Sequence, residues 1–329
     1  MSTRVLPLIA VLGATGAQGG GTVRALLEGG RFAVRALTRQ PEGAAAQALR
    51  HAGAEVVHAD LDDPATLRAA FAGAQGLFAV TPYWTHHSPE REFDQARHIA
   101  EAAAAAEVPH VVWSTQEDTR RWVPLEDERL PTLRGRWKVP HCDAKGAANT
   151  LFRERGVPTT LLTPSFFWEN LIRYGMQPQR AADGRLIFML PMGPLPLPGM
   201  AVADVGHIAR AIFERPQRWI GKSLGVAGAH VDGVRMAAAL ARTLGEPVQH
   251  HSPRFAEVAA LPFPGAAEMA NMFRFLHDFN DEVRAMRPVA ATRELHPGLL
   301  DFDAWLTLHG HRLPLERRGS AYEAGLLAH

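Results

Sequence analysis

The chain has 329 residues, of which 35 are Lys or Arg and 34 are Asp or Glu, so its formal net charge is +1. This balance gives no electrostatic reason to expect a nucleic acid or an acidic membrane as a partner. A single cysteine excludes an intrachain disulfide, and no apolar run approaches the ~18 residues of a membrane-spanning helix. We expect a cytoplasmic globular protein, either a monomer or a homodimer.

Short apolar segments alternate with helical segments over the first half of the chain. Strands are predicted at 8–12, 33–37, 55–59, 76–82, 110–114 and 159–163, and helices at 22–28 and 89–108. The first strand runs directly into a glycine-rich loop without a cleavage-site pattern, so it is not read as a signal peptide. Apolar strands that alternate with helices are typical of a parallel sheet covered on both faces. The predicted fold is therefore α/β, a doubly wound parallel Rossmann sheet.

The pattern changes after residue 164. The segment 188–200 is rich in proline and glycine, which predicts loop or edge structure. Later helices alternate with short strands at 223–228 and 247–251. We expect a NAD(P)-binding Rossmann domain over 1–163 and a smaller substrate-side region over 164–312, some of whose segments return to the main sheet. A tail over 313–329 is expected to be loose or helical only in a crystal.

Three glycines follow the first predicted strand at equal spacing. Gly13, Gly16 and Gly19 lie between this strand and the first helix. Glycine permits a tight turn, a close approach of the backbone to a pyrophosphate and close packing of helix on strand. The helix N-terminus adds N–H groups and a dipole that favour a phosphate. A strand-to-helix turn could need the same glycines without a ligand, but the βα units that follow favour dinucleotide binding.

The end of the second strand indicates which dinucleotide binds. Arg39 stands 20 positions after Gly19, and no acidic residue occurs from 37 to 41. A NAD site usually has a carboxylate there for the ribose 2′-hydroxyl, whereas arginine suits the 2′-phosphate of NADP. The alternative is a solvated arginine at a strand end. The sequence favours NADP(H) over NAD(H).

These stretches resemble the NmrA-like family of atypical short-chain dehydrogenases, which contains regulators, redox sensors and enzymes. GATGAQGG is similar to the family's glycine loop, LTR to its phosphate-binding arginine, and GAEVVHADLDD to its adenine-side segment. FAVTPYW and PSFFWENL resemble its fourth-strand motif and its segment near the nicotinamide. The resemblance implies that the cofactor contacts Gly13, Thr15, Gly16, Gln18, Gly19, Arg39, Asp60, Thr81, Pro82, Lys145 and Phe167.

The catalytic motif of active short-chain dehydrogenases is absent. They use Tyr-x-x-x-Lys, in which tyrosine exchanges a proton and lysine binds the nicotinamide ribose. None of the three tyrosines here has a lysine four positions later. His141 and Lys145 stand in that spacing, as in NmrA-like sensors, and would share one helix face. We predict that Lys145 contacts the cofactor. His141 either replaces tyrosine as acid and base or makes a structural hydrogen bond.

Several other features allow both a functional and a structural interpretation. Ser114 and Thr115 either bind substrate or end a strand. The segment 116–140 is either a lid or a solvated loop, and Phe166, Phe167 and Trp168 form either a nicotinamide wall or core. Cys142 is expected to be a small buried apolar residue. The histidine pairs lack other ligands at matching spacing, so no metal is expected.

Two functions follow from these residues. The missing tyrosine favours an NADP(H)-binding redox sensor or regulator that acts on a protein partner. Lys145 and the apolar segment near it also suit an NADPH-dependent reductase of a small carbonyl, quinone or conjugated substrate. The sequence leaves open whether the chain is an enzyme or an NADP scaffold.

Overall fold

The computed structural model describes residues 5–315, and the predicted tail lies mostly outside them. Contacts within the chain define two compact units. The first unit comprises the chain up to Asp118, His141–Pro164 and Val202–Leu224. The second unit comprises Thr119–Pro140, Ser165–Ala201 and the chain from Gly225 onward. No helix within residues 5–315 is long and apolar enough to cross a membrane.

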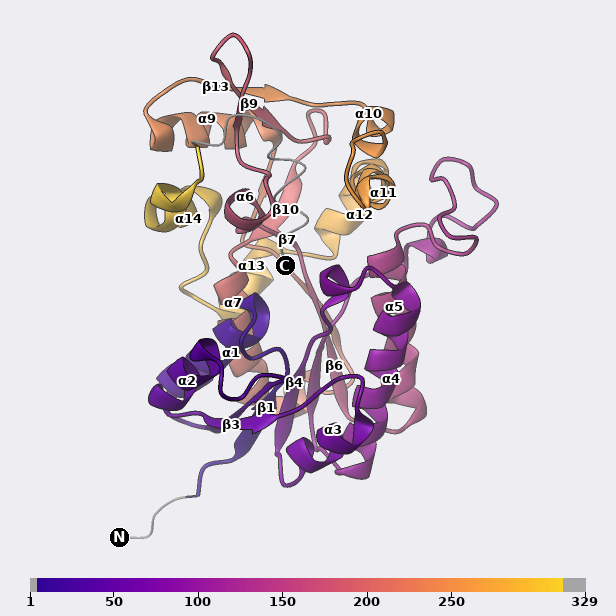
Figure 1. Ribbon diagram of the computed structural model, residues 1–329, viewed down its shortest axis with the longest axis vertical. Coiled ribbons are helices and arrows are strands. Elements are labelled where there is room, and N and C mark those ends of the chain that lie inside the picture. Colours follow the sequence, from indigo (N-terminus) through magenta and orange to yellow (C-terminus); the bar gives the residue numbers. More distant parts are fainter. Residues whose placement is uncertain (1–4, 316–329) are drawn as a thin grey trace. The chain divides into compact units, whose positions relative to one another are not determined.

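A seven-stranded sheet forms the centre of the first unit (Figure 1). Its order is β11-β6-β5-β4-β1-β2-β3, and every pair from β6 across to β3 is parallel. The strands are β1 (Leu8–Val11), β2 (Ala33–Thr38), β3 (Glu55–His58), β4 (Gly76–Ala79), β5 (Val111–Ser114), β6 (Thr159–Pro164) and β11 (Ser223–Val226). The predicted doubly wound α/β fold is confirmed.

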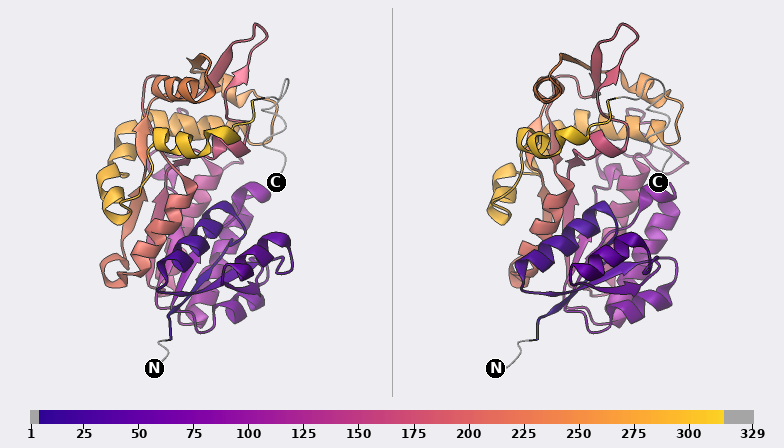
Figure 2. Two further views of the ribbon diagram at one scale, coloured as in Figure 1. Left: turned by 90° about the vertical axis from the view of Figure 1, so that its left-hand side faces the viewer. Right: turned by 60° about the vertical axis from the view of Figure 1, so that its left-hand side comes forward.

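Helices cover both faces of this sheet (Figures 1 and 2). On one face lie α1 (Ala17–Gly29), α2 (Ala44–His51) and α7 (Val202–Phe213). On the other lie α3 (Pro64–Phe71), α4 (Pro89–Ala105) and α5 (Pro140–Glu154). Short elements complete this unit: η1 (Tyr83–Thr85) and α8 (Pro216–Trp219). Side chains alternate along each strand, so Ala10 and Leu12 join the apolar cluster under α3, α4 and α5.

Helix α1 begins at Ala17, so the predicted start at residue 22 was wrong. The run Gly19–Gly21 lies inside the helix although glycine is a poor helix former. Within this run a Cβ on Gly19 would lie 2.2 Å from the Gly13 carbonyl oxygen, and on α7 a Cβ on Gly206 would lie 2.3 Å from the Gly21 carbonyl oxygen. Tertiary packing of α1 on α7 therefore outweighs the helix propensity of these residues.

Two three-stranded sheets and a set of helices form the second unit. One sheet has the order β12-β10-β7 and the other β13-β9-β8. The strands are β7 (Phe166–Phe167), β8 (Gln179–Arg180), β9 (Leu186–Met189), β10 (Leu197–Met200), β12 (Ala229–Val231) and β13 (Val248–His251). The helices are α6 (Asn170–Arg173), α9 (Gly233–Leu244), α10 (Phe255–Ala259), α11 (Ala266–Asp278), α12 (Asn280–Ala285), α13 (Val289–Leu295) and α14 (Phe302–His309), with η2 (Thr119–Arg121) and η3 (Gly310–Arg312).

The prediction of loop or edge structure at 188–200 holds for 190–196 but was wrong at the two ends of the segment. This segment contains the end of β9 and all of β10, and both are central strands of their sheets. Pro198 has no N–H, but the neighbouring carbonyl of Gly199 accepts a hydrogen bond from Gly228 at 2.8 Å. Gly199 is required because a Cβ there would lie 2.3 Å from Trp168 Nε1. The glycine therefore makes room for a tryptophan in the core.

The segment that leads into α5 is anchored within the second unit. The buried Lys138 ammonium donates to the carbonyl oxygens of Leu125, Asp127 and Leu130 at 3.1, 2.7 and 2.7 Å. Asn271 of α11 donates to the carbonyl oxygens of Pro131 and Lys138. The segment is thus a folded connection with its own buried cation and not a solvated loop.

Candidate functional site

The predicted cofactor residues of the first unit gather at one edge of its sheet. The strand order reverses between β1 and β4, and ligands of such sheets bind beyond the carboxyl ends of the strands at this point. Gly13 follows β1, Arg39 follows β2, Asp60 follows β3 and Thr81 follows β4. Because the strands are parallel, all four residues lie at the same edge.

The loop after β1 requires glycine at two positions. Gly13 has a φ of +62°, which favours glycine, and a Cβ on Gly19 would lie 2.2 Å from the Gly13 carbonyl oxygen. Gly16 is the N-cap of α1, and its N–H donates to the same oxygen at 2.8 Å. The first turn of α1 contains no acidic residue, so its N–H groups and dipole face no carboxylate of their own helix.

The side chains around this loop are partly fixed. Thr15 is exposed, whereas Gln18 Oε1 accepts a hydrogen bond from Ser114 Oγ of β5 at 2.7 Å. Thr115 Oγ1 donates to Asn149 Oδ1 at 2.7 Å and lies 3.1 Å from the Lys145 carbonyl oxygen. Ser114 therefore supports the glycine loop, and Thr115 fastens α5 to the end of β5.

Arg39 is exposed at the end of β2. Within residues 5–315 its guanidinium has no hydrogen-bond or ion-pair partner. The nearest acidic side chain along the chain, Glu42, is held by Arg50 at 2.9 Å, and the hydrogen bond from Arg50 lowers the pKa of Glu42. This carboxylate is therefore engaged elsewhere, and Arg39 can take an anionic ligand.

Asp60 lies in the turn between β3 and α3. Its Oδ1 accepts a hydrogen bond from the Asp62 N–H at 3.0 Å. Asp62 in turn pairs with Arg91 of α4 at 2.5 Å and accepts from Gln95 at 3.0 Å. The hydrogen bond from Arg91 is the main reason that the pKa of Asp62 is lowered. The turn that carries Asp60 is thus tied to α4.

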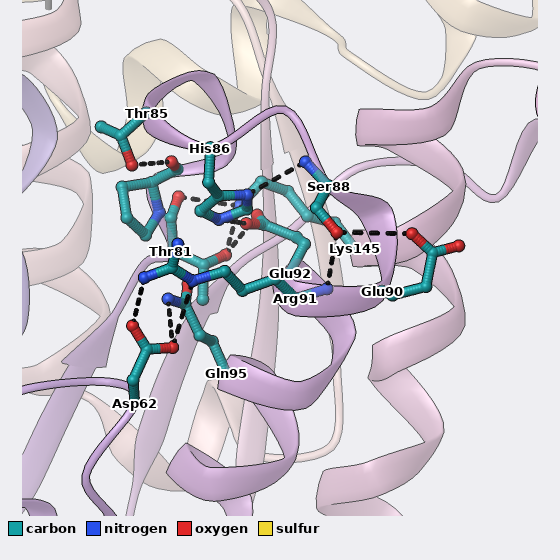
Figure 3. Close-up of polar contacts among 11 residues, drawn as sticks. Asp62, Thr81, Thr85, His86, Ser88, Glu90, Arg91, Glu92, Gln95 and Lys145 are labelled. Atoms are coloured by element: carbon teal, nitrogen blue, oxygen red, sulfur yellow. Dashed lines mark hydrogen bonds and ion pairs between the residues drawn. The ribbon is translucent and has the colours of Figure 1, made fainter.

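Lys145 reaches from α5 to the end of β4 (Figure 3). Its Nζ lies 2.6 Å from Thr81 Oγ1, 3.1 Å from the Thr81 carbonyl oxygen and 2.5 Å from Glu92 Oε1. Thr81 Oγ1 also donates to Glu92 Oε1 at 2.5 Å. The ammonium group therefore has one acceptor for each of its three N–H bonds. Pro82, the next residue, begins the short helix η1 and accepts from the Thr85 N–H.

The carboxylate of Glu92 is buried, with its side chain 1% exposed. Burial would raise its pKa, but the charge of Lys145 and hydrogen bonds from His86, Lys145 and Thr81 outweigh burial, and the pKa of Glu92 is lowered. His86 Nε2 lies 3.3 Å from Glu92 Oε2, and His86 Nδ1 accepts the Ser88 N–H at 3.1 Å. Because Nδ1 accepts a hydrogen bond, a ring proton lies on Nε2, which faces Glu92.

His141 and Lys145 both contact the segment after β4, as their spacing predicts. The His141 ring is 8% exposed, and its centroid lies 4.9 Å from that of Trp84 and 5.7 Å from that of Tyr83. Burial raises the pKa of the neighbouring Cys142 thiol. Gly146 of α5 packs closely against the chain after β5, because a Cβ there would lie 2.3 Å from the Asp118 backbone nitrogen.

Phe167 belongs to β7 of the second unit, where it is half-buried. Its neighbour Trp168 is a core residue, 1% exposed, with its ring 5.5 Å from Phe302 and 6.1 Å from Trp305. Phe166 packs against the same core. The contribution of Phe167 to a cofactor site stays a prediction. Between residues 5 and 315, no cluster of three His, Cys, Asp or Glu side chains could hold a metal ion.

Comparison with known proteins adds the family to this geometry. A model of the NmrA-like family matches residues 7–306. The chain belongs to the NmrA-like family. This membership confirms the resemblance seen in the glycine loop and the motifs around it.

The chain is similar to several known proteins. It is 32% identical to the NmrA-like family domain-containing oxidoreductase FrzB of Cladobotryum sp. over 234 residues, 65% of this chain and 67% of that protein. It is 29% identical to the NAD(P)H azoreductase of Xenophilus azovorans over 244 residues, 74% of this chain and 76% of that protein. The solved structure of NmrA, a negative transcriptional regulator, in complex with NADP has a TM-score of 0.74 at 22% identity and covers 91% of this chain and 94% of its own.

In this NmrA-like chain, the sequence analysis missed Glu92 and His86. A signal for Glu92 existed, because Glu92, Ala96, Ile99 and Ala103 recur at helical spacing and all prove buried. An acid on the apolar stripe of a helix predicts a buried partner. His86 gave no comparable signal, since its position depends on the fold of the short helix η1.

Proposed function

We propose that the chain binds NADP(H), in preference to NAD(H), at the carboxyl edge of the first unit's sheet. The observation that carries this proposal is Arg39, exposed at the end of β2 without a protein partner among residues 5–315. A guanidinium can hold a 2′-phosphate through two parallel N–H bonds and stays charged. Solved structures of NmrA hold NADP in one case and NAD in another. The preference in this chain is therefore inferred from its own residues.

Each predicted residue has a place in this proposal. The N–H groups of the glycine loop bind the pyrophosphate, Asp60 lies by the adenine, and Thr81, Pro82 and Lys145 lie by the nicotinamide ribose. The first unit is the dinucleotide-binding domain, and the second unit, which carries Phe167, is the substrate or partner region. The residues in this assignment are Gly13, Thr15, Gly16, Gln18, Gly19, Arg39, Asp60, Thr81, Pro82, Lys145 and Phe167.

We infer that the protein acts as a redox sensor or regulator. His141 stands where active short-chain dehydrogenases have tyrosine, and its ring is buried against Trp84 and Tyr83. A group enclosed in this way is poorly placed to exchange protons with a substrate. A sensor must respond differently to NADPH and NADP⁺, because a ligand shifts an equilibrium only by its differential affinity for the two states.

Calorimetric titration with NADPH, NADP⁺, NADH and NAD⁺ tests the cofactor preference. The unmodified protein is expected to bind NADPH at least tenfold more tightly than NADH, since a charged hydrogen bond contributes about 1.5–3 kcal/mol. Arg39→Ala should remove most of this difference. Arg31→Ala is the matched control, because Arg31 is an exposed arginine in the same unit. Equal affinities for NADPH and NADH in the unmodified protein would contradict the proposal.

The names of the relatives favour a second function, that of a reductase. FrzB is named as an oxidoreductase and the Xenophilus azovorans protein as an NAD(P)H azoreductase. A hydride would pass from NADPH to the substrate, a proton would come from water or His141, and NADP⁺ would leave. NADPH oxidation with azo, quinone and carbonyl substrates tests this function. Turnover that falls in His141→Ala would favour the reductase over the sensor.

A further inference from the structure

The function proposed above leaves one buried charge without a role. Glu92 lies on the buried face of α4, and its side chain is 1% exposed. An ionised carboxylate is costly to bury unless partners compensate it. Here Lys145 and Thr81 direct donors at Glu92 Oε1, and His86 Nε2 lies 3.3 Å from Glu92 Oε2. A carboxylate surrounded in this way belongs to a buried polar network that includes the Lys145 ammonium.

We propose that Glu92 is a positioning residue of the dinucleotide site, which fixes the Lys145 ammonium beside the carboxyl end of β4. The proposal rests on the proposed function, in which Lys145 holds the nicotinamide ribose. Glu92 supplies the countercharge at 2.5 Å, and Thr81 Oγ1 bridges the two groups because it accepts from Lys145 and donates to Glu92. The ammonium therefore has one position, set by two residues 11 positions apart, one after β4 and one in α4.

The same contacts indicate how Lys145 reaches a ligand. All three of its N–H bonds have protein acceptors, and the Thr81 carbonyl oxygen, at 3.1 Å, is the most distant. A ribose hydroxyl can replace this neutral acceptor with the ion pair intact, and the carbonyl has a second lone pair for other donors. Glu92 thus keeps the ammonium in place during the exchange.

The network does not have the form of a proton relay. His86 Nδ1 accepts the backbone N–H of Ser88 at 3.1 Å, so this nitrogen cannot pass a proton onward. A chain of proton transfers from Lys145 through Glu92 would therefore end at His86. His86 Nε2 lies 3.3 Å from Glu92 Oε2, the carboxylate oxygen that Lys145 does not contact, which suits a positioning role.

Two ligands separate this role from a general contribution to the fold. NADPH contains the nicotinamide ribose, whereas adenosine 2′,5′-bisphosphate contains only the adenine, its ribose 2′-phosphate and one 5′-phosphate. Glu92→Gln keeps the size of the side chain and removes its charge. We expect it to weaken NADPH binding about tenfold or more and to change binding of adenosine 2′,5′-bisphosphate less than about twofold. Asp94→Asn, at an exposed position of the same helix, should change neither affinity.

A second variant tests whether Glu92 acts through Lys145. In a Lys145→Met background, Glu92→Gln should cause no further loss of NADPH affinity, because the group that Glu92 positions is absent. Glu92→Asp, which keeps the charge but shortens its reach, should show the same selective loss and covers the case in which the glutamine variant fails to fold.

The outcomes are distinct. Equal losses for both ligands, an unchanged NADPH affinity in Glu92→Gln, or additive losses in the double variant would overturn the positioning role. An unmodified protein that binds neither ligand would overturn the proposed function itself.

Discussion

At the scale of single residues, partners decide what a charged or titratable side chain does. Lys145 and Lys138 are both largely buried, yet Lys138 donates to three backbone carbonyls while Lys145 is paired with a carboxylate. Lys138 therefore holds a loop together, whereas Lys145 lies at the end of β4 among the predicted cofactor residues. Sequence spacing identified Lys145, because His141 and Lys145 on α5 match the spacing of the Tyr-x-x-x-Lys motif. No such spacing pointed to the role of Lys138.

The buried histidine His110 makes the stability of the fold depend on pH. His110 Nε2 contacts Thr160 Oγ1 at 2.8 Å, and Thr160 Oγ1 donates to the Trp219 carbonyl, so Nε2 carries the ring proton. Burial lowers the pKa of His110 from 6.5 to about 4. The unfolded chain therefore binds a proton on His110 between these values while the folded chain does not, and stability falls as the pH falls from 6.5 toward 4.

Urea unfolding at pH 6.5 and pH 5 measures this effect. We expect His110 to account for about 2 kcal/mol of lost stability over this interval, at 1.36 kcal/mol per pH unit. His110→Asn should reduce the pH dependence by that amount, whereas His51→Gln, at an exposed histidine, should not. A pH dependence that is the same in the His110 variant and the unmodified protein would refute the assignment.

At the scale of elements, the glycines of the β1–α1 turn differ in how tightly the fold constrains them. A Cβ on Gly19 would lie 2.2 Å from the Gly13 carbonyl oxygen, a backbone atom that cannot move away cheaply. A Cβ on Gly16 would lie 3.2 Å from the same oxygen, and Gly16 has an extended backbone that alanine also adopts. The two positions should therefore respond differently to the same substitution.

Gly19→Ala is expected to destabilise the fold by about 1–3 kcal/mol through overpacking, measured as a lower urea midpoint. Gly16→Ala should stay within about 1 kcal/mol of the unmodified protein but bind NADPH more weakly, because its methyl group enters the space proposed for the pyrophosphate. Unchanged NADPH affinity in Gly16→Ala would place the pyrophosphate elsewhere.

The sequence predicted strands well where local pattern and burial agree. The apolar runs of β1, β2 and β5 were placed within a residue or two, because parallel strands buried on both faces are apolar throughout. Strand β10 was missed, because Pro198 and Gly199 are typical of loops and only contact with Trp168 explains the glycine. For Glu92 the helical pattern places an acid on the buried face of α4, but its partners Thr81 and Lys145 come from the segment after β4 and from α5, which no local pattern identifies.

At the scale of the whole molecule, the two units interleave along the chain. The first unit carries the glycine loop, Arg39, Asp60 and the Lys145 network, whereas the second carries Phe167 and the anchored segment before α5. This division explains why the sequence describes the first unit in detail and the second hardly at all. Glycine loops and strand-end charges follow local rules, whereas the second unit depends on contacts between distant segments.

Hydrogen exchange of the unmodified protein with and without saturating NADPH tests the central claim most directly. A dinucleotide at the carboxyl edge of the sheet should slow amide exchange at 13–19, after β2 at 39–43 and after β4 at 81–86. NADH at the same concentration should protect these segments less, above all the segment that contains Arg39. Protection confined to other parts of the chain, or equal protection of 39–43 by NADH and NADPH, would contradict the account.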